Sequence, residues 1–418
     1  MAQVKVDFIR RNLIELSKQL AKLNIPLMVR LCSDYQDAAR KVAEVAQSID
    51  AKQVFWNREY LIHEISRDKQ CSGLLSEAQI ASTSFEDSPI VPPGQVISGA
   101  GEMYKVFTPF FRNWHEQVSS FPAGLLPTPA SQTKSSLESD AINPLFEQID
   151  CQDSSHWPAG ESSALMQLNS FALQDGAREY KLNRDLPSVE GTSKLSPYLS
   201  IGALSARQCL AEASRVSGAG EWIRQLAWRD FYYHLTQIHP KIVRGKPFQA
   251  KTEKIQWRQS DQDLLAWTEG NTGQPFVDAG MRQLKQKGWM HNRLRMVTAM
   301  FLTKNLFLDW RLGERHFMQH LIDGDFALNN GGWQWSASTG TDAVPYFRVF
   351  NPFSQSKRFD PEGIFIKEYV PELAEIPASA LHDPTKLDAQ RPESYPRLIV
   401  DIKASRKEAI RAFSELSA

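Results

Sequence analysis

The chain has 418 residues, which is enough for roughly two or three domains with hydrophobic cores of their own. Lys plus Arg equals Asp plus Glu, at 48 each, so no overall charge draws the protein to nucleic acid or membrane, and any basic surface must be local. The four cysteines show neither a disulfide framework nor metal-ligand spacing, which favours a reducing cytoplasm. No secretory leader and no long apolar run is present, so a soluble protein is expected.

Residues 1–124 alternate between helical and strand-like patterns. Apolar residues recur at helical spacing over 9–23, and the segment 25–32 (IPLMVRLC) is typical of a buried strand. A helix-like run over 35–49 then leads into the strand-like segment 52–57. This alternation predicts an α/β domain built on a doubly wound parallel sheet.

The chain changes character beyond residue 124. Residues 125–164 are rich in Ser and Pro and are predicted to connect two domains, whereas 165–418 have helical periodicity and are predicted to form an all-α domain. Eight of the eleven tryptophans lie between 222 and 335, where core packing is one explanation. Two stripes at helical spacing mix Trp with Arg, amide or Met, and these are predicted to wall a cavity for a planar ligand. The stripes are Trp222, Gln225 and Arg229, flanked by Trp228, and Trp289, Asn292, Arg293 and Met296.

The segment before residue 200 has the composition of an anion site. Thr192, Ser193 and Lys194 precede Ser196 and Pro197, a pair that suits the N-cap and first turn of a helix. The N-terminus of a helix beside hydroxyls and a lysine binds phosphate, although an ordinary capped helix has the same signature. The Asp-x-Asp at 323–325 fails the EF-hand spacing, because an alanine occupies the fifth ligand position, and no metal site is predicted.

Five long motifs occur in a recognisable order. They are EGTSKLSPYLSIGALSARQC, WRDFYYHL, GQPFVDAGMRQL, GWMHNRLRMVTAMFL and DGDFALNNGGWQWSASTGTDAVPYFRVFNP, which begin at residues 190, 228, 273, 288 and 323. Together they resemble the DNA photolyase/cryptochrome family, and most closely its bacterial class I cyclobutane pyrimidine dimer photolyases. The resemblance runs from about residue 4 to the end.

The resemblance implies that the helical domain holds a U-shaped FAD. The hydroxyl-rich segment would face the phosphates, the two aspartates the sugar and isoalloxazine, and Asn329 the flavin N5 atom. Arg295 would form a buried ion pair with Asp323, and Gly331 and Gly332 would allow a tight, close-packed turn. The matching positions are Tyr180, Thr192, Ser193, Lys194, Leu195, Ser196, Arg229, Arg295, Asp323, Asp325 and Asn329, with Lys194 standing where relatives often have Arg.

The resemblance also divides the tryptophans between two tasks. Trp257, Trp310 and Trp333 match an electron relay from flavin to surface, whereas Trp228 and Trp335 match the walls of a pocket for a flipped-out dimer. Gln225, Asn292, Arg293 and Met296 would lie beside that pocket. Candidate phosphate contacts are Arg184, Arg293, Arg348, Lys357 and Arg358. Light-excited reduced FAD would lend the dimer an electron, so no acid–base triad is expected.

The beginning of the chain departs from the family pattern. Relatives start with a strand and an arginine-containing loop, whereas MAQVKVDFIRRNL opens on a helix, so the sheet is expected to lack its first strands. An internal methionine taken as the start, or a truncated form, would explain this. The segment 101–110 resembles the folate-antenna segment, in which Glu102 would bind methenyltetrahydrofolate.

Three other functions stay open at this stage. A cryptochrome photoreceptor shares the flavin site but usually adds a C-terminal tail, and a six-four photolyase would carry histidines where this chain has Asn292 and Met296. A helical DNA-binding module without cofactor is the third. Gln225, where class I enzymes generally have Glu, is the one position that favours six-four enzymes. Damaged DNA is the expected partner, with no membrane association, and a monomer is expected.

Overall fold

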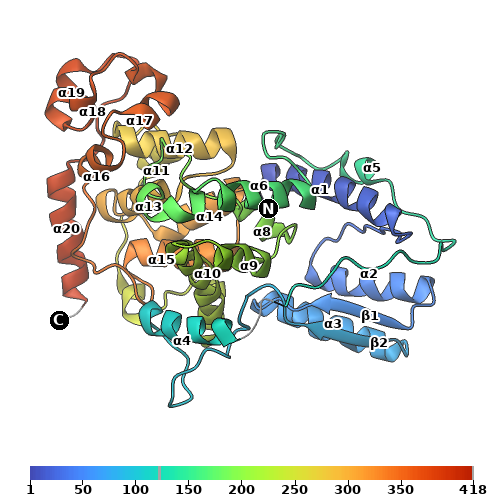
Figure 1. Cartoon of the computed structure of the whole chain (residues 1–418). Coiled ribbons are helices and arrows are strands. Elements are labelled where there is room, and N and C mark those ends of the chain that lie inside the picture. Colours follow the sequence, from blue (N-terminus) through green and yellow to red (C-terminus); the bar gives the residue numbers. More distant parts are fainter. Residues whose placement is uncertain (121–123, 417–418) are drawn as a thin grey trace.

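The computed structural model describes residues 1–120 and 124–416 and divides visibly into a large helical body and a smaller α/β part (Figure 1). The α/β part holds two strands, β1 (Gln53–Asn57) and β2 (Ala81–Phe85), which pair in parallel with Gln53 opposite Ala81. Helices α2 (Tyr35–Ser48) and α3 (Ile62–Glu77) pack against each other beside them. A small parallel sheet whose strands are connected by the crossover helix α3 therefore confirms the α/β prediction.

The predicted strand at 25–32 is wrong. No strand is assigned there, and the polar backbone groups find partners on the connection to the helical body. Leu27 N–H donates to Ser139 Oγ at 3.0 Å, Val29 N–H donates to Asp140 Oδ2 at 2.7 Å, and Asp140 N–H donates to the Leu27 carbonyl at 2.9 Å. A strand needs a neighbouring strand, and the described sheet does not extend to this segment.

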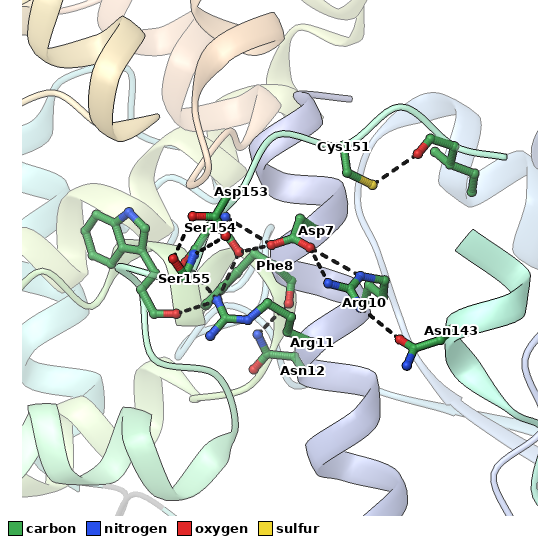
Figure 2. Close-up of polar contacts among 12 residues, drawn as sticks. Asp7, Phe8, Arg10, Arg11, Asn12, Asn143, Cys151, Asp153, Ser154 and Ser155 are labelled. Atoms are coloured by element: carbon green, nitrogen blue, oxygen red, sulfur yellow. Dashed lines mark hydrogen bonds and ion pairs between the residues drawn. The ribbon is translucent and has the colours of Figure 1, made fainter. Parts of the chain in front are cut away.

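Helix α1 (Gln3–Lys22) packs with the helical body through a different face from the one its periodicity predicts. Val4 and Phe8 are buried, and the Phe8 ring meets Tyr198 at 5.5 Å, whereas the predicted row beginning at Ile9 is only half-buried or exposed. Figure 2 shows why this face points inward: the Asp7 carboxylate accepts from Ser154 N–H at 3.0 Å and Ser154 Oγ at 2.6 Å. Arg11 donates to the Ser154 carbonyl at 2.7 Å, so α1 is fixed to the connecting segment.

The hydrophobic core extends across the expected domain boundary at residue 124 through helices α4 (Phe107–Ser120) and α10 (Gly220–Ile238). Asp230 of α10 is fully buried and accepts from Ile90 N–H at 3.1 Å, Val91 N–H at 2.9 Å and Trp114 Nε1 at 2.8 Å. Burial raises the pKa of Asp230 to about 6. The α1 and α4 helices thus share one hydrophobic core with the helical body, while α2 and α3 have a small core of their own.

The connection contains a short helix, α5 (Ile142–Phe146), and gives way to α6 four residues before its expected end. The remaining elements of the helical body are α6 (Glu161–Leu173), α7 (Gly176–Asn183), α8 (Ser196–Ile201), α9 (Ala206–Arg215), η1 (Pro240–Arg244), η2 (Ala250–Lys254), α11 (Asp261–Thr268), α12 (Pro275–Lys287), α13 (Asn292–Met300), the π-helical η3 (Phe301–Asn305), α14 (Trp310–His320), α15 (Phe326–Ala337), α16 (Pro352–Phe359), α17 (Ile364–Tyr369), η4 (Pro371–Leu373), α18 (Ala378–Leu381), α19 (Pro384–Gln390) and α20 (Ile402–Glu415).

The centre of the helical body is formed by α12–α15, which pack closely on one another. The wholly buried Lys304 of η3 donates to the Ala337 carbonyl at 3.1 Å and Ser338 Oγ at 3.0 Å, which ties η3 to the C-terminal end of α15, and burial lowers the pKa of Lys304 well below its ordinary value. All four cysteines are free. Within 1–120 and 124–416, no helix is both long and apolar enough to cross a membrane.

Candidate functional site

The turn before α15 holds both predicted aspartates. Asp325 is the N-cap of α15, where its Oδ1 accepts from Leu328 N–H at 3.1 Å and its Oδ2 accepts from the Tyr233 hydroxyl at 2.5 Å. Asp323 is buried and accepts two bonds from Arg295, at 2.8 and 3.1 Å. The predicted Arg295–Asp323 pair is therefore confirmed, and it ties α13 to the start of α15.

The two glycines that follow lie inside α15, so the predicted tight turn is wrong, although close packing is right for one of them. A Cβ atom on Gly331 would lie 2.1 Å from the Tyr232 ring of α10, whereas a Cβ on Gly332 would meet nothing within 4 Å. Gly331 thus allows α15 and α10 to approach closely. Asn and Gly are typical of turns, and the sequence alone does not reveal the contact with Tyr232.

Asn329 is held from α14. Its Nδ2 donates to the Glu314 carbonyl at 2.9 Å, and the neighbouring Asn330 Nδ2 donates to the Glu314 carboxylate at 2.9 Å. Burial raises the pKa of Glu314. In the part of the chain that the structure describes, no hydrogen bond uses the Asn329 amide oxygen, so this half-buried group can still accept one.

The predicted phosphate segment leads into α8, but Ser196 is the first helical residue and not the N-cap, which is Leu195. The hydroxyls of Tyr180, Thr192 and Ser193 are on half-buried residues, and none has a hydrogen-bond partner within residues 1–120 and 124–416. Lys194 has φ +51° and pairs with Glu190. Unpaired, partly buried hydroxyls of this kind are what a phosphate or sugar needs.

Trp289 lies before α13 and not on it, so its predicted stripe is broken. Gly288 ends α12 with φ +61°, and His291 caps α13 by accepting from Arg293 N–H at 3.2 Å. The Trp289 indole instead donates to Ser196 Oγ at 3.4 Å. This bond links Ser196 to the residues just before α13, and the Arg295 pair links α13 to the aspartate turn.

Arg229, which is predicted to lie near a phosphate, is buried and contacts Ser88. Its guanidinium donates to the Ser88 carbonyl at 2.8 Å and to Ser88 Oγ at 3.2 Å, and it stacks over the Tyr233 ring at 4.9 Å. Trp222, from the same predicted stripe, is 4% exposed and packs on Phe171 in the core. Trp222 and Arg229 of the first stripe are therefore core residues.

A cavity of about 660 Å³ lies between α1, the segment 59–64 and the loop after α8. Asp325 is the one predicted site residue among those described that lines this cavity, and its partner Tyr233 lines it too. Lys5 of α1 also lines this cavity, and its ammonium donates to the Gly324 carbonyl at 2.7 Å, between the two aspartates. Burial lowers the pKa of Lys5, with Asp325 and Asp323 opposing the effect. Lys5, Tyr233 and Glu314 were missed because each contact joins distant parts of the sequence.

The three predicted relay tryptophans belong to one hydrophobic cluster. Trp333 is 2% exposed and Trp310 is 1% exposed, whereas Trp257 is only partly buried at its edge. The Trp333 indole N–H is buried without a partner among the described residues. Trp267, which the relay does not include, packs edge-on to Trp333 at 6.0 Å. Trp257 is thus the one relay candidate of the three that is partly exposed to solvent.

The predicted lesion and DNA residues have several environments. Trp228 stacks on Phe107 at 3.7 Å with nearly parallel rings, so one face of this indole is already covered. Exposed Asn292 approaches the Met296 sulfur at 3.8 Å on one face of α13, and Gln225 Nε2 donates to the Glu221 carbonyl at 3.3 Å. Trp335 is half-buried, and Arg184 pairs with Glu221 at 2.9 Å. The other exposed members are Arg348, Lys357, Arg358 and, for the antenna, Glu102.

Comparison with known proteins identifies the family of this chain. Residues 222–415 match the FAD binding domain of DNA photolyase, and residues 1–132 match the DNA photolyase model. Deoxyribodipyrimidine photo-lyases of Vibrio cholerae and Escherichia coli are each 43% identical to this chain over 99% of its length, and it covers 90% and 89% of theirs. The chain belongs to the DNA photolyase family.

Solved structures of the photolyase family have the same fold. A class III photolyase from Agrobacterium tumefaciens superposes with a TM-score of 0.88 at 31% identity, covering 100% of this chain and 89% of its own. A cryptochrome from Synechocystis superposes with a TM-score of 0.83 at 26% identity, covering 99% of this chain and 89% of its own. The helical body of this photolyase-family chain is its FAD-binding domain, and the unpaired hydroxyls and the free amide oxygen of Asn329 fit that cofactor.

Proposed function

We propose that this protein is a light-driven DNA repair enzyme, a deoxyribodipyrimidine photo-lyase that splits cyclobutane pyrimidine dimers. The observation that carries the proposal is 43% identity, over nearly the whole chain, to two photo-lyases of that name. Reduced FAD supplies the chemistry when bound, because near-ultraviolet or blue light lets it lend the dimer an electron that returns after the ring opens. The chain contributes position, dryness and charge, and needs no acid–base triad.

The flavin would be held between the hydroxyl segment and the aspartate turn. Tyr180, Thr192 and Ser193 would donate to phosphates and sugar, since their hydroxyls have no other partner in the described chain. The Arg295–Asp323 pair would fix the distance between α13 and α15. Asn329 would offer its free amide oxygen to the flavin N5 position while Glu314 fixes its Nδ2.

Electrons for reactivating oxidised flavin would travel along Trp333, Trp310 and Trp257. Their burial supports a relay supplied from the surface, because Trp333 and Trp310 are buried and Trp257 alone of the three is partly exposed, so electrons would move inward and the hole outward. Trp333 has no acceptor for its indole proton among the residues that the structure describes, so a hole formed there would keep that proton and pass on more readily than a trapped neutral radical. Repair by flavin that is already reduced would not use this path.

The lesion would be bound outside α13. Asn292 and Met296 share one exposed face, with Arg293 next in sequence, and Trp335, Gln225 and Trp228 complete the proposed pocket. Extrusion of the dimer costs only a few kcal/mol, since a damaged step stacks poorly. The exposed side chains of Arg348, Lys357 and Arg358 would contact phosphates as a local basic rim.

Two alternatives have specific observations behind them. The fold shared with a cryptochrome supports a photoreceptor, and Gln225 supports activity on the six-four photoproduct. Asn292 and Met296 favour the cyclobutane dimer. A folate antenna, with Glu102 as its candidate acid, action as a monomer and a place in the cytoplasm are further parts of the proposal.

The deciding experiment uses purified protein and two oligonucleotides. An absorption spectrum first tests for flavin. A duplex with one defined thymine dimer and a duplex with one six-four photoproduct are then illuminated or kept dark, and intact thymines are measured. Light-dependent loss of the dimer alone is the expected result. A flavin-containing protein that leaves the dimer untouched in the light would overturn the proposal.

A further inference from the structure

A carboxylate lies between two of the arginines proposed to contact DNA. The Asp185 Oδ1 atom is 2.7 Å from the terminal nitrogen of Arg293 and 4.0 Å from Nε of Arg184. Arg184 also pairs with Glu221 at 2.9 Å. This corner of the surface thus combines two guanidinium groups with two carboxylates and has no net charge.

The geometry of Arg293 is unusually restricted for a surface arginine. Its guanidinium lies 4.1 Å over the Phe359 ring, its side chain is only 13% exposed, and its Nε is buried without a partner among the described residues. Asp185 is the one acid with which it forms an ion pair there. The pair is therefore partly shielded from water and stronger than an average exposed ion pair.

We propose that Asp185 is a built-in competitor of DNA phosphate for Arg293, and that it weakens the hold of the enzyme on DNA. A guanidinium binds carboxylate and phosphate through the same fork of N–H groups, so a phosphate must displace Asp185 before it can use Arg293. The displaced carboxylate then lies beside the phosphate and repels it. This inference rests on the proposed function, because it takes Arg293 as a phosphate contact. It assigns Asp185 a further role: it lets the enzyme leave repaired DNA.

The exchange predicts a distinctive salt dependence. When phosphate replaces Asp185 on Arg293, one ion pair is broken for each one made, so this contact contributes little to net counterion release. With the carboxylate neutralised, the same contact releases one more counterion, and the slope of log affinity against log salt steepens by about 0.9. A merely structural role for Asp185 would not change the slope in this way.

The test is dark binding of labelled duplexes, undamaged or with one thymine dimer, over a series of salt concentrations. Asp185→Asn should bind both duplexes about fivefold more tightly at low salt, with the steeper slope. Asp185→Glu should behave as wild type, because it keeps the charge. Asp175→Asn is the matched control, since it removes an equal charge from an exposed pair with Arg178, and should change affinity less than about twofold.

A double variant makes the assignment specific. In an Arg293→Gln background, Asp185→Asn should change affinity less than about twofold, since the cation it would release is missing. A wild-type slope for Asp185→Asn, or the full gain without Arg293, would overturn the proposal. Should Asp185→Asn fail to fold by circular dichroism, Asp185→Ser carries the same loss of charge and the same expectation. Failure of the proposed function would look different, because wild type would then show no light-dependent repair of the dimer whatever Asp185 does to binding.

Discussion

Adjacent glycines in α15 provide a test in which the same substitution has opposite expected signs. A Cβ atom on Gly331 would lie 2.1 and 2.2 Å from two carbons of the Tyr232 ring, whereas a Cβ on Gly332 enters open space. Real contacts of a Cβ begin near 3.4 Å, so the ring would have to retreat by roughly 1.3 Å. Tyr232 has little room, since Trp228 and Phe231 flank it at 5.6 and 6.1 Å.

The magnitudes follow from helix propensity and overpacking. Ala in place of Gly stabilises a helix interior by about 0.5–1 kcal/mol, which is the whole effect expected for Gly332→Ala. Overpacking costs about 1–3 kcal/mol, so Gly331→Ala should lower the free energy of unfolding by about 1–2 kcal/mol after the helix gain. The two variants should thus differ by about 2 kcal/mol, with wild type between them.

The assay is urea unfolding of the flavin-free protein, followed by far-ultraviolet circular dichroism, with both variants measured in parallel. Adding Tyr232→Leu to Gly331→Ala should recover more stability than the single effects predict, because the two side chains compete for one space. A Gly331→Ala protein as stable as Gly332→Ala would refute the reasoning. Such a result would mean that the close approach of α10 and α15 does not require a glycine at position 331.

Four further predictions concern the flavin, the relay, the lesion and pH. Asn329→Ala should retain FAD, since many contacts hold it, but should shift its midpoint potential; complete loss of flavin from a folded variant would contradict the assigned role. Trp257→Phe should slow photoreduction of oxidised flavin while chemically reduced enzyme repairs normally, and equal loss of both would count against the relay. Gln225→Glu should leave dimer repair intact or improve it, since a charge-assisted hydrogen bond contributes about 1.5–3 kcal/mol against about 0.5–1.5 for a neutral one. The substrate assignment would be wrong if wild type repaired the six-four photoproduct and this variant did not. Burial lowers the pKa of His234 from 6.5 to about 4, so between these pH values the folded protein binds fewer protons than the unfolded chain and loses stability as pH falls. His234→Gln should reduce that loss by up to about 1.4 kcal/mol per pH unit in urea titrations. An unchanged dependence of the unfolding free energy on pH would exclude His234 as the cause.

The sequence predicts most strongly what depends on neighbouring residues. The helical pattern over 221–240 corresponds to α10, and the strand-like segment 52–57 to β1. The segment 25–32 looks equally strand-like, but a strand also needs a partner, and that is a property of distant residues. Ser196 shows the same limit on a smaller scale, because its hydroxyl suits an N-cap while the backbone begins the helix one residue earlier than a cap requires.

The site follows the same rule. Resemblance to a family predicts that Arg295 pairs with Asp323, and this ion pair is present. Neither the Tyr232 ring against Gly331 nor the Glu314 anchor of Asn329 has a signal in the local sequence, since each joins separate helices. The spacing of Trp289 predicts a place on a helix, yet α12 ends before it at Gly288. A side chain on Gly288 would clash with Val4.

The contacts of α10 show how the N-terminal part is attached to the helical body next to the proposed site. Arg229, Asp230 and His234 all point from α10 toward the segment 88–94, where they bind its backbone. From the same helix, Tyr233 donates to Asp325 at the start of α15. A second attachment comes from Lys5 of α1, which donates to the carbonyl between the two aspartates. Because both attachments end at the aspartate turn, the N-terminal residues position the two acids proposed to face the flavin, whether or not they also hold an antenna pigment.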